Sequence, residues 1–292
     1  MRVVSLCPSL TELVFALGRG DALVGRTRFC HRPAGLVEHV ERVGGTKNPK
    51  VARVAELRPD LVLMNEEENR REDADALAAA GVPLHVSFPK DAADTAAMIR
   101  DIARLLGAGD AGERLAADLD RRAAAVRARA AARRAAGAPP LRWAYLIWRR
   151  PWMAVRDDTF VSALLDAAGG ANVFAGAGAR YPEVTAADLA AADPDVVLLA
   201  SEPFPFTAAH GDELAAETGL PRARFVPADG ELLSWHGART AEGVEYAESL
   251  LEAARREGDA LTGGRVLPDF RRRVAAPSEG LAPADDASPR NA

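Results

Sequence analysis

The sequence predicts an α/β protein built of two Rossmann-like α/β lobes joined by one long backbone helix. Three observations predict it. Short apolar segments alternate with helical patterns through the first hundred or so residues, as in a mainly parallel sheet. A long Ala/Arg-rich segment then interrupts the alternation, which starts again after it. We expect an N-terminal lobe, a backbone helix, a C-terminal lobe and a mostly disordered tail, at residues 1–108, 109–137, 138–257 and 258–292 respectively.

The backbone helix is predicted over residues 110–136. This segment has no proline and consists mostly of alanine, leucine, arginine and acidic residues, a composition that favours helix. Leu115, Leu119 and Val126 form one narrow apolar stripe, and the helix would span about 40 Å. Gly137 and the prolines after it end the helix. We expect a strut lying across the outside of two folded units; an ordinary long surface helix is the alternative.

The composition of the chain indicates which classes of protein it can belong to. The chain has 292 residues, 48% of them hydrophobic and 27% charged, which is a globular mixture. A net charge of −5 gives no reason to expect nucleic acid as a partner. Two cysteines are too few for a disulfide framework. The N-terminus has no signal-peptide pattern and no apolar run reaches the ~20 residues of a membrane span, so the chain as written predicts a cytoplasmic protein.

The elements expected in the first lobe begin with a buried strand at residues 3–6. Ser9 is predicted as the N-cap of the next helix, with Glu12 completing a capping box. Further strands are expected at residues 23–25, 61–64 and 84–88, and helices at 51–56, 70–80 and 92–106. In the second lobe we expect strands at 143–147, 196–199 and 224–226, and helices at 160–168, 186–191 and within 238–256.

A weak internal repeat supports two lobes. The segment PDLVLM from Pro59 matches PDVVLL from Pro194, and a glutamate stands eight residues after each proline, at Glu67 and Glu202. Pro-Asp before a strand is also common turn chemistry, which is the alternative explanation. If the repeat reflects duplication, the two glutamates follow equivalent strands, and ligands of open α/β sheets bind beyond such strand ends.

The loops after the predicted strands hold the unusual residues of the chain. Three of the four tryptophans lie in these loops beside charged side chains. We interpret them as the lining of a cleft between the lobes for a flat, partly apolar ligand; the alternative is that the aromatic rings close the ends of each core. The candidate ligand-binding residues are Phe29, Cys30, His31, Lys47, Asn48, Glu67, Trp148, Arg150, Trp152, Arg180, Tyr181, Glu202, Phe204, Trp235 and His236.

Evidence for catalysis or a metal centre in the sequence is weak. No GxSxG, HExxH, P-loop or GxGxxG motif is present, so we expect no enzyme and no required cofactor. Cys30 and His31 are adjacent, without the spacing that closes a metal site locally. A composite site of Cys30, His31 and His236 remains a hypothesis, and so does His236 as an axial ligand. His39, His85 and His210 are interpreted as surface or hydrogen-bonded histidines.

Three segments carry a family resemblance. They are RVVSLCPSLTELVFALGRGDALVG, VGGTKNPKVARVAELRPDLVL and YPEVTAADLAAADPDVVLL. In their order they resemble the helical-backbone (class III) substrate-binding proteins of ABC importers, nearest to the cobalamin-binding branch beside the ferric-siderophore binders. The resemblance covers residues 2–254. It implies two α/β lobes on one backbone helix, a ligand held between the lobes, and an aromatic pocket residue at Tyr181.

The resemblance sets the leading hypothesis. It implies a monomeric, non-enzymatic protein that holds cobalamin, or a related corrinoid or metal chelate, for an ABC-type uptake system. Family members dock on the permease through a glutamate on each lobe, and Glu72 and Asp188 are the nearest positions here. The alternative is a cytoplasmic enzyme or cofactor carrier of the same fold that handles a metal chelate through Cys30, His31 and His236. A third hypothesis is a binding module whose cleft has decayed.

Overall fold

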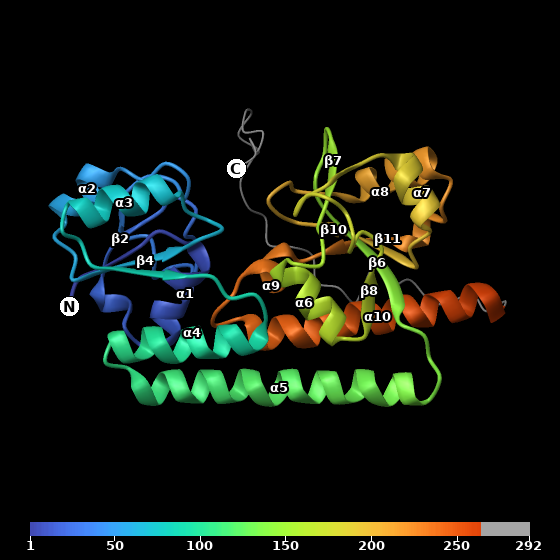
Figure 1. Ribbon diagram of the computed structural model, residues 1–292, viewed down its shortest axis with the longest axis horizontal. Helices are drawn as coiled ribbons and strands as arrows, with labels where there is room; N and C mark the ends of the chain where they lie inside the picture. The colour runs from blue at the N-terminus through green and yellow to red at the C-terminus, as the bar shows by residue number, and fades with distance from the viewer. Residues whose placement is uncertain (264–292) are drawn as a thin grey trace. The chain divides into compact units, whose positions relative to one another are not determined.

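The computed structural model describes residues 1–263, with side chains described to residue 257. The chain divides into two compact units, shown in Figure 1. Unit 1 contains Met1–Ala138, Asp158–Gly169 and Leu232–Glu248, and unit 2 contains Pro139–Asp157, Gly170–Glu231 and the chain from Ser249. Two segments of the predicted C-terminal lobe, 158–169 and 232–248, therefore group with unit 1. The predicted tail from residue 264 onward lies outside the described residues.

Unit 1 is built on a five-stranded parallel sheet of order β3-β2-β1-β4-β5. Valines, leucines and one methionine from the sheet and its helices pack into a core cluster beside it. The strands are β1 (Val3–Ser5), β2 (Leu23–Arg26), β3 (Glu41–Arg42), β4 (Leu61–Asn65) and β5 (Leu84–Ser87). The connecting helices are α1 (Pro8–Ala16), α2 (Val51–Glu56), α3 (Arg71–Ala79) and α4 (Ala92–Leu105), with a short 3-10 turn at Gly20–Ala22.

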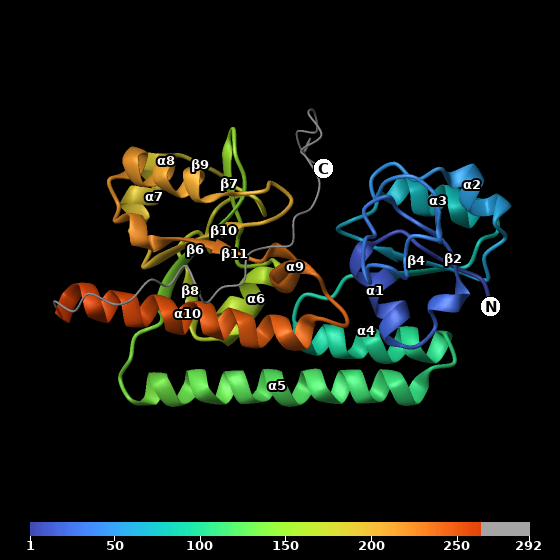
Figure 2. The same cartoon turned by 180° about the vertical axis from the view of Figure 1, so that it is seen from behind.

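The long helix α5 (Gly109–Ala135) is confirmed within one residue of its predicted ends. It lies along α4 in both views (Figure 1, Figure 2). Its buried residues are Gly112, Ala116, Leu119, Ala123 and Val126. They are mostly small, which lets the backbones of α4 and α5 approach closely. The predicted stripe contributes Leu119 and Val126 to this face, whereas Leu115 is only partly buried.

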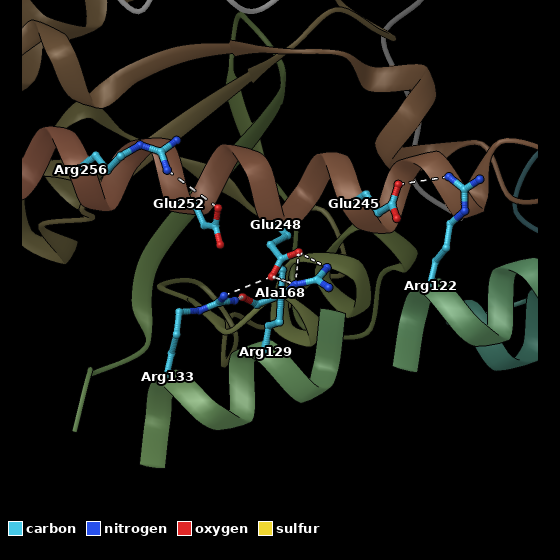
Figure 3. A network of polar contacts seen from close by, with 8 residues as sticks. All are labelled: Arg122, Arg129, Arg133, Ala168, Glu245, Glu248, Glu252 and Arg256. Atoms are coloured by element: carbon cyan, nitrogen blue, oxygen red, sulfur yellow. Dashed lines mark hydrogen bonds and ion pairs between the residues drawn. The ribbon is translucent and has the colours of Figure 1, made fainter. Parts of the chain in front are cut away.

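Charged side chains fix α5 to its neighbours in unit 1 (Figure 3). Glu248 of α10 (Thr240–Gly263) is buried and accepts hydrogen bonds from Arg129, at 2.5 and 3.0 Å, and from Arg133 at 3.1 Å. Arg133 also donates to the carbonyl oxygen of Ala168, just after α6 (Phe160–Ala167), at 3.0 Å. One turn earlier on α10, Glu245 pairs with Arg122 at 3.1 Å on a more exposed surface. The same helix α5 is thereby joined to α6 and α10.

Unit 2 is built on a six-stranded mixed sheet. Its main path is β11-β10-β6-β7-β9, and β8 pairs with the first half of β6. The strands are β6 (Leu141–Trp148), β7 (Trp152–Ala154), β8 (Gly170–Asn172), β9 (Glu183–Val184), β10 (Val196–Ala200) and β11 (Phe225–Ala228). The helices are α7 (Ala186–Ala192) and α8 (Ala208–Thr218), with a 3-10 turn at Arg222–Arg224. The unit boundary passes through α9 (Gly230–Ser234) and α10.

The internal repeat is confirmed at the level of single hydrogen bonds. A carboxylate oxygen of Asp60 accepts from the backbone N–H of Arg2 at 2.7 Å, and Asp195 accepts from Arg142 at the same distance. In return the N–H of each aspartate donates to the carbonyl of that same arginine at 2.8 Å. β4 pairs with β1 in parallel, as β10 pairs with β6. Glu67 and Glu202 therefore follow equivalent strands, as predicted.

The start of α1 differs from the prediction. The N-cap is Cys7, it makes no side-chain cap bond, and Pro8 occupies the first turn. A proline there supplies the right φ and lacks only an N–H that would have no helical partner. Ser9 lies inside the helix, and Glu12 forms an ion pair with Arg239 at 2.6 Å instead of completing a capping box.

Several elements of unit 2 were not predicted, among them β7, β8, β9 and α8. The hairpin of β6 and β7 falls where a loop was expected, because Trp152–Ala154 is too short to show alternation. Helix α8 was missed because its sequence, AAHGDELAAET, contains a glycine and has few large apolar residues. Within the described residues, no helix is long and apolar enough to cross a membrane.

Candidate functional site

Two buried asparagines shape the loop at the carboxyl end of β4 in unit 1. The side-chain oxygen of Asn65 accepts from the backbone N–H groups of Glu67 and Glu68, at 3.0 and 3.1 Å. The amide of Asn69 donates to the carbonyl oxygens of Leu6 and Thr46, at 2.9 and 3.0 Å. Its oxygen accepts from the N–H of Asn65 at 2.9 Å. These hydrogen bonds fix both ends of the acidic loop, which consists of the three glutamates at residues 66–68.

His236 is joined to this loop. The amide nitrogen of Asn65 donates to Ser87 O at 2.9 Å and to Nε2 of His236 at 3.1 Å. Because that Nε2 accepts, the proton of the neutral ring is on Nδ1. Ser9 Oγ lies 3.4 Å from the same Nε2, and the ring meets Phe160 edge-to-face. Burial lowers the pKa of His236 to about 4, with Glu67 opposing the shift, so the imidazole is neutral at physiological pH.

The segment that carries Trp235 and His236 is held against α1. Arg239 makes a two-pronged ion pair with Glu12, at 2.6 and 2.7 Å, and its guanidinium lies 5.3 Å from the centre of the Trp235 ring. Trp235 is buried, and its ring meets His31 edge-to-face with centroids 5.4 Å apart. Residues 235–239 are therefore part of unit 1, far as they are from its other residues in sequence.

The loop after β2 is organised around Arg26. This side chain is almost wholly buried and donates to three backbone carbonyls, those of Thr27, Cys30 and Val37, at 3.2, 2.8 and 2.9 Å. Cys30 is buried as well, and its Sγ is hydrogen-bonded to the hydroxyls of Thr11 and Thr27. The loop presents the Phe29 and His31 side chains on the surface.

Both cysteines are buried thiols. Burial raises the pKa of the Cys30 thiol, and burial followed by the charge of Glu68 raises that of Cys7. Among the residues with described side chains, no three or more His, Cys, Asp or Glu side chains are arranged to hold a metal ion. The composite site of Cys30, His31 and His236 is therefore not formed.

Lys47 and Asn48 lie on an exposed turn beside the acidic loop. Lys47 Nζ donates to the carbonyl oxygen of Glu67 at 2.6 Å. The turn needs glycine at Gly44, where φ is +113° and a Cβ would lie 2.7 Å from the carbonyl oxygen of Asn48. Burial raises the pKa of Glu68, with Lys47 opposing and Glu67 adding to the shift. This edge of unit 1 therefore combines carboxyl groups, one ammonium and aromatic rings.

In unit 2 the predicted aromatic residues pack on one another. Trp148 and Phe204 meet edge-to-face at 5.9 Å, and Phe204 meets Phe206 at 4.9 Å. Trp152 stacks on Phe206 with an interplanar angle of 19°, and His210 lies against both phenylalanines. The cluster stands at the carboxyl ends of β6 and β10. Phe206 belongs to the hydrophobic core of unit 2, and Trp152 and Phe204 pack against that core. This agrees with the alternative interpretation, in which aromatic rings cover the end of the core.

Polar groups flank this cluster. Arg149 makes a two-pronged ion pair with Glu213 at 2.6 and 3.1 Å, which lowers the pKa of Glu213. The Arg180 guanidinium lies 5.8 Å from the Tyr181 ring centre. The N–H of Gly230 donates to Ser201 Oγ at 2.9 Å. Gly230 also lies so close to Glu202 that a Cβ on the glycine would be 3.0 Å from the backbone nitrogen of Glu202. Arg150 lies on the exposed β6–β7 turn.

The predicted docking residues differ in their surroundings. Glu72 is exposed in the first turn of α3. Asp188 closes the capping box of α7 by accepting from the N–H and the hydroxyl of Thr185, at 2.8 and 2.7 Å. These hydrogen bonds lower the pKa of Asp188. Transporter docking through either residue, and the shared cleft, stay predictions.

Sequence reasoning missed the residues that position the site, chiefly Arg26, Asn65, Asn69, Ser9 and Arg239. One signal was visible: in the run Asn65–Asn69, read NEEEN, an asparagine stands at each end of three glutamates. Asparagines at loop ends often bond the local backbone, which both do here.

Comparison with known proteins identifies the family. The family model described as periplasmic binding protein matches residues 3–226. The chain belongs to this family. A vitamin B12-binding protein of Vibrio parahaemolyticus is 28% identical over 196 residues, covering 67% of this chain and 69% of that protein. A vitamin B12-binding protein of Yersinia pestis is 27% identical over 198 residues, covering 68% and 69%.

Solved structures of family members share the fold. The periplasmic heme-binding protein RhuT from Roseiflexus sp. RS-1 has a TM-score of 0.74 at 28% identity, covering 87% of this chain and 98% of that one. BtuF, the periplasmic vitamin B12-binding protein of Vibrio cholerae, has a TM-score of 0.76 at 23% identity, with the same coverage. The predicted fold class and the family resemblance are thereby confirmed. The names of these relatives describe them as binding proteins for vitamin B12 or heme.

Proposed function

We propose that this protein binds cobalamin, or a closely related corrinoid, as the substrate-binding component of an ABC-type uptake system. The observation that carries the proposal is that polar side chains follow equivalent strands of the two sheets, Glu67 after β4 in unit 1 and Glu202 after β10 in unit 2, and that each unit also carries aromatic side chains on its loops. Open α/β sheets bind ligands there. The vitamin B12-binding relatives support cobalamin as the ligand.

The charge of the unit 1 edge supports a corrinoid over heme. The rim of a corrin ring carries neutral amides, whereas the rim of heme carries two carboxylates. Glu67 and Glu68 lie on the loop whose backbone Asn65 and Asn69 hold in place. Carboxylates there accept hydrogen bonds from amide N–H groups and repel heme carboxylates.

Heme is the second candidate, because RhuT and BhuT, the latter solved in complex with two hemes, are each 28% identical to this chain. Titrating the purified protein with cyanocobalamin, aquocobalamin and hemin, followed by tryptophan quenching, separates the two. We expect saturable one-to-one binding of both cobalamins at micromolar concentration or below, and weaker binding of hemin. Tight binding of hemin without binding of either cobalamin would show that heme is the ligand instead. If none of the three compounds binds, the proposal is refuted.

A pair of variants tests the acidic loop. Glu67→Gln is expected to weaken cobalamin binding about tenfold, the value of one hydrogen bond to a charged group. Glu66→Gln, one residue earlier and exposed, is the matched control and should leave the affinity unchanged. Equal affinities for the two variants would remove Glu67 from the site.

A further inference from the structure

The solvent-exposed side of α5 carries a regular charge pattern. Seven exposed positions follow one another along this helix at alternating spacings of four and three residues. They are Glu113, Ala117, Asp120, Ala124, Arg127, Ala131 and Arg134, and we call them the α5 seam. This spacing keeps residues on one side of a helix, and its mean period of 3.5 residues is that of a coiled-coil contact. The seam contains none of the buried residues of α5.

The charges of the α5 seam change sign at its middle. Charged residues alternate with alanines, two acidic residues come first and two arginines follow, and Ala124 is the central position. Read in reverse, the seam has the opposite charge at every charged position and alanine at every alanine position. The helix dipole favours this polarity only within the first and last turns, so it does not account for Asp120 and Arg127.

These charges are not balanced within the chain. Glu113 and Asp120 share a single arginine, Arg100 of α4, at 2.8 and 3.0 Å, and their side chains stay 61% and 49% exposed. Within the described part of the chain, the side chains of Arg127 and Arg134 form no hydrogen bond or ion pair. The first half of the seam therefore keeps an excess of negative charge, and the second half keeps an excess of positive charge.

We propose that the α5 seam binds the α5 seam of a second copy of this chain, with the two helices antiparallel and a two-fold axis beside Ala124. A two-fold contact brings the same surface of both copies together, so that every pair occurs twice. Reversal of the seam sets Glu113 of one copy opposite Arg134 of the other, and Asp120 opposite Arg127. A parallel arrangement would set like charges against each other, which is unfavourable.

The alanines of the seam suit the same arrangement. Reversal sets Ala117 opposite Ala131 and Ala124 opposite its own copy, and small side chains let two helices approach closely. A dimer of this kind differs from the monomer that the family resemblance implies, and it does not depend on the identity of the ligand. Because one helix pair forms a small interface, we expect weak association with a Kd on the order of 100 μM.

Sedimentation equilibrium of the full-length, ligand-free protein, at concentrations up to about 1 mM, tests the dimer. We expect a monomer–dimer equilibrium at low ionic strength that weakens about tenfold in high salt, because exposed ion pairs are screened. The variant Arg127→Glu with Arg134→Glu makes the seam wholly acidic and should be monomeric. Lys50→Glu with Arg42→Glu, which reverses two exposed charges outside α5, is the matched control and should associate as the wild type does.

Mixing complementary variants tests the pairing itself. Glu113→Lys with Asp120→Lys makes the seam wholly basic and should also be monomeric alone. An equal mixture of the acidic and basic variants should restore a dimer, because their charges oppose each other along the whole seam. Circular dichroism checks that each variant is folded, since the basic variant loses the ion pairs to Arg100.

Cross-linking tests the direction of the helices without changing any charge of the seam. Ala124→Cys should cross-link to itself with a short bismaleimide, because it lies at the two-fold axis. Ala117→Cys alone should not, because 14 residues of helix would separate its two copies by about 21 Å. A mixture of Ala117→Cys and Ala131→Cys should cross-link. The wild type, whose cysteines are both buried, is the control.

Three results would overturn the proposal. The first is a wild type that stays monomeric at all concentrations, as it would if the seam served a different partner. The second is a dimer that persists unchanged in the acidic variant. The third is self-cross-linking of Ala117→Cys as efficient as that of Ala124→Cys, which would indicate parallel helices. The cobalamin titration is independent of all three, so either proposal can fail while the other stands.

Discussion

At the scale of single residues, His236 makes stability depend on pH. Its pKa is about 4 in the native chain, because of burial, against 6.5 in an unfolded chain. Between these values the unfolded chain binds a proton that the native chain does not, so stability falls as pH falls. The difference corresponds to about 3 kcal/mol.

Urea unfolding at pH 7.5 and pH 4 measures this effect. Between these pH values the wild type should lose about 3 kcal/mol more than His236→Gln, whose side chain does not titrate. Taking the difference between the two proteins removes contributions from other groups, such as Glu68, whose pKa burial raises. Parallel pH dependences in the two proteins would show that His236 is not the buried neutral group described above.

Single residues also mark the limit of prediction from sequence. The candidates Glu67, Trp235 and His236 were found because they are unusual residue types after apolar segments. Asn65 and Arg26 were not found, because they act through hydrogen bonds to backbone groups and, for Asn65, through a contact with the side chain of His236, 171 positions away. Such contacts depend on tertiary packing, which no local pattern reports.

At the scale of elements, the buried carboxylate of Glu248 joins α10 to α5. Glu248→Ala would remove the buried carboxylate that accepts hydrogen bonds from Arg129 and Arg133, and breaking such a pair is costly. Because Arg129 is half exposed, we expect a loss of about 2 kcal/mol in the free energy of unfolding, below the ~3–5 kcal/mol of fully buried pairs.

Glu245→Ala is the matched control on the same helix. Its ion pair with Arg122 is more exposed, so its loss should cost less than about 1 kcal/mol. Equal losses in the two variants, measured by urea unfolding, would contradict the role given to Glu248.

The close packing of α4 and α5 depends on Gly112. A Cβ at this position would lie 2.2 Å from the Cβ of Ala103, and backbone must move to relieve the clash. Gly112→Ala should therefore destabilise the protein by about 1–2 kcal/mol, although alanine is the better helix former. Gly109→Ala, with open space around the new Cβ, should be neutral or slightly stabilising. A more stable Gly112→Ala variant would refute this packing.

The elements that could be predicted are those with a strong local pattern. Helix α5 and strands β4 and β10 were predicted within two residues, because composition and apolar runs determine them. The short strands β7 and β9 owe their existence to pairing with each other and with β6. Two or three residues carry no periodicity, so sequence alone does not reveal them.

At the scale of the whole molecule, unit 1 is not a continuous piece of chain. Residues 232–248 complete it through the bonds of His236 to Asn65 and of Arg239 to Glu12. We therefore expect a fragment of residues 1–138 to lose cooperative folding or most of its stability, because α1 and the β4 loop lose these partners. Circular dichroism in urea measures this. A fragment that unfolds cooperatively at the midpoint of the full chain would contradict the description.

The central claim is that the loops beyond the carboxyl ends of both sheets bind the ligand. Hydrogen–deuterium exchange with and without aquocobalamin tests it most directly, because it reports every loop at once. We predict slower exchange on ligand addition in residues 27–33, 44–48, 66–69, 148–152 and 201–204. Unchanged exchange in these loops, or protection confined to the opposite ends of the strands, would contradict the account.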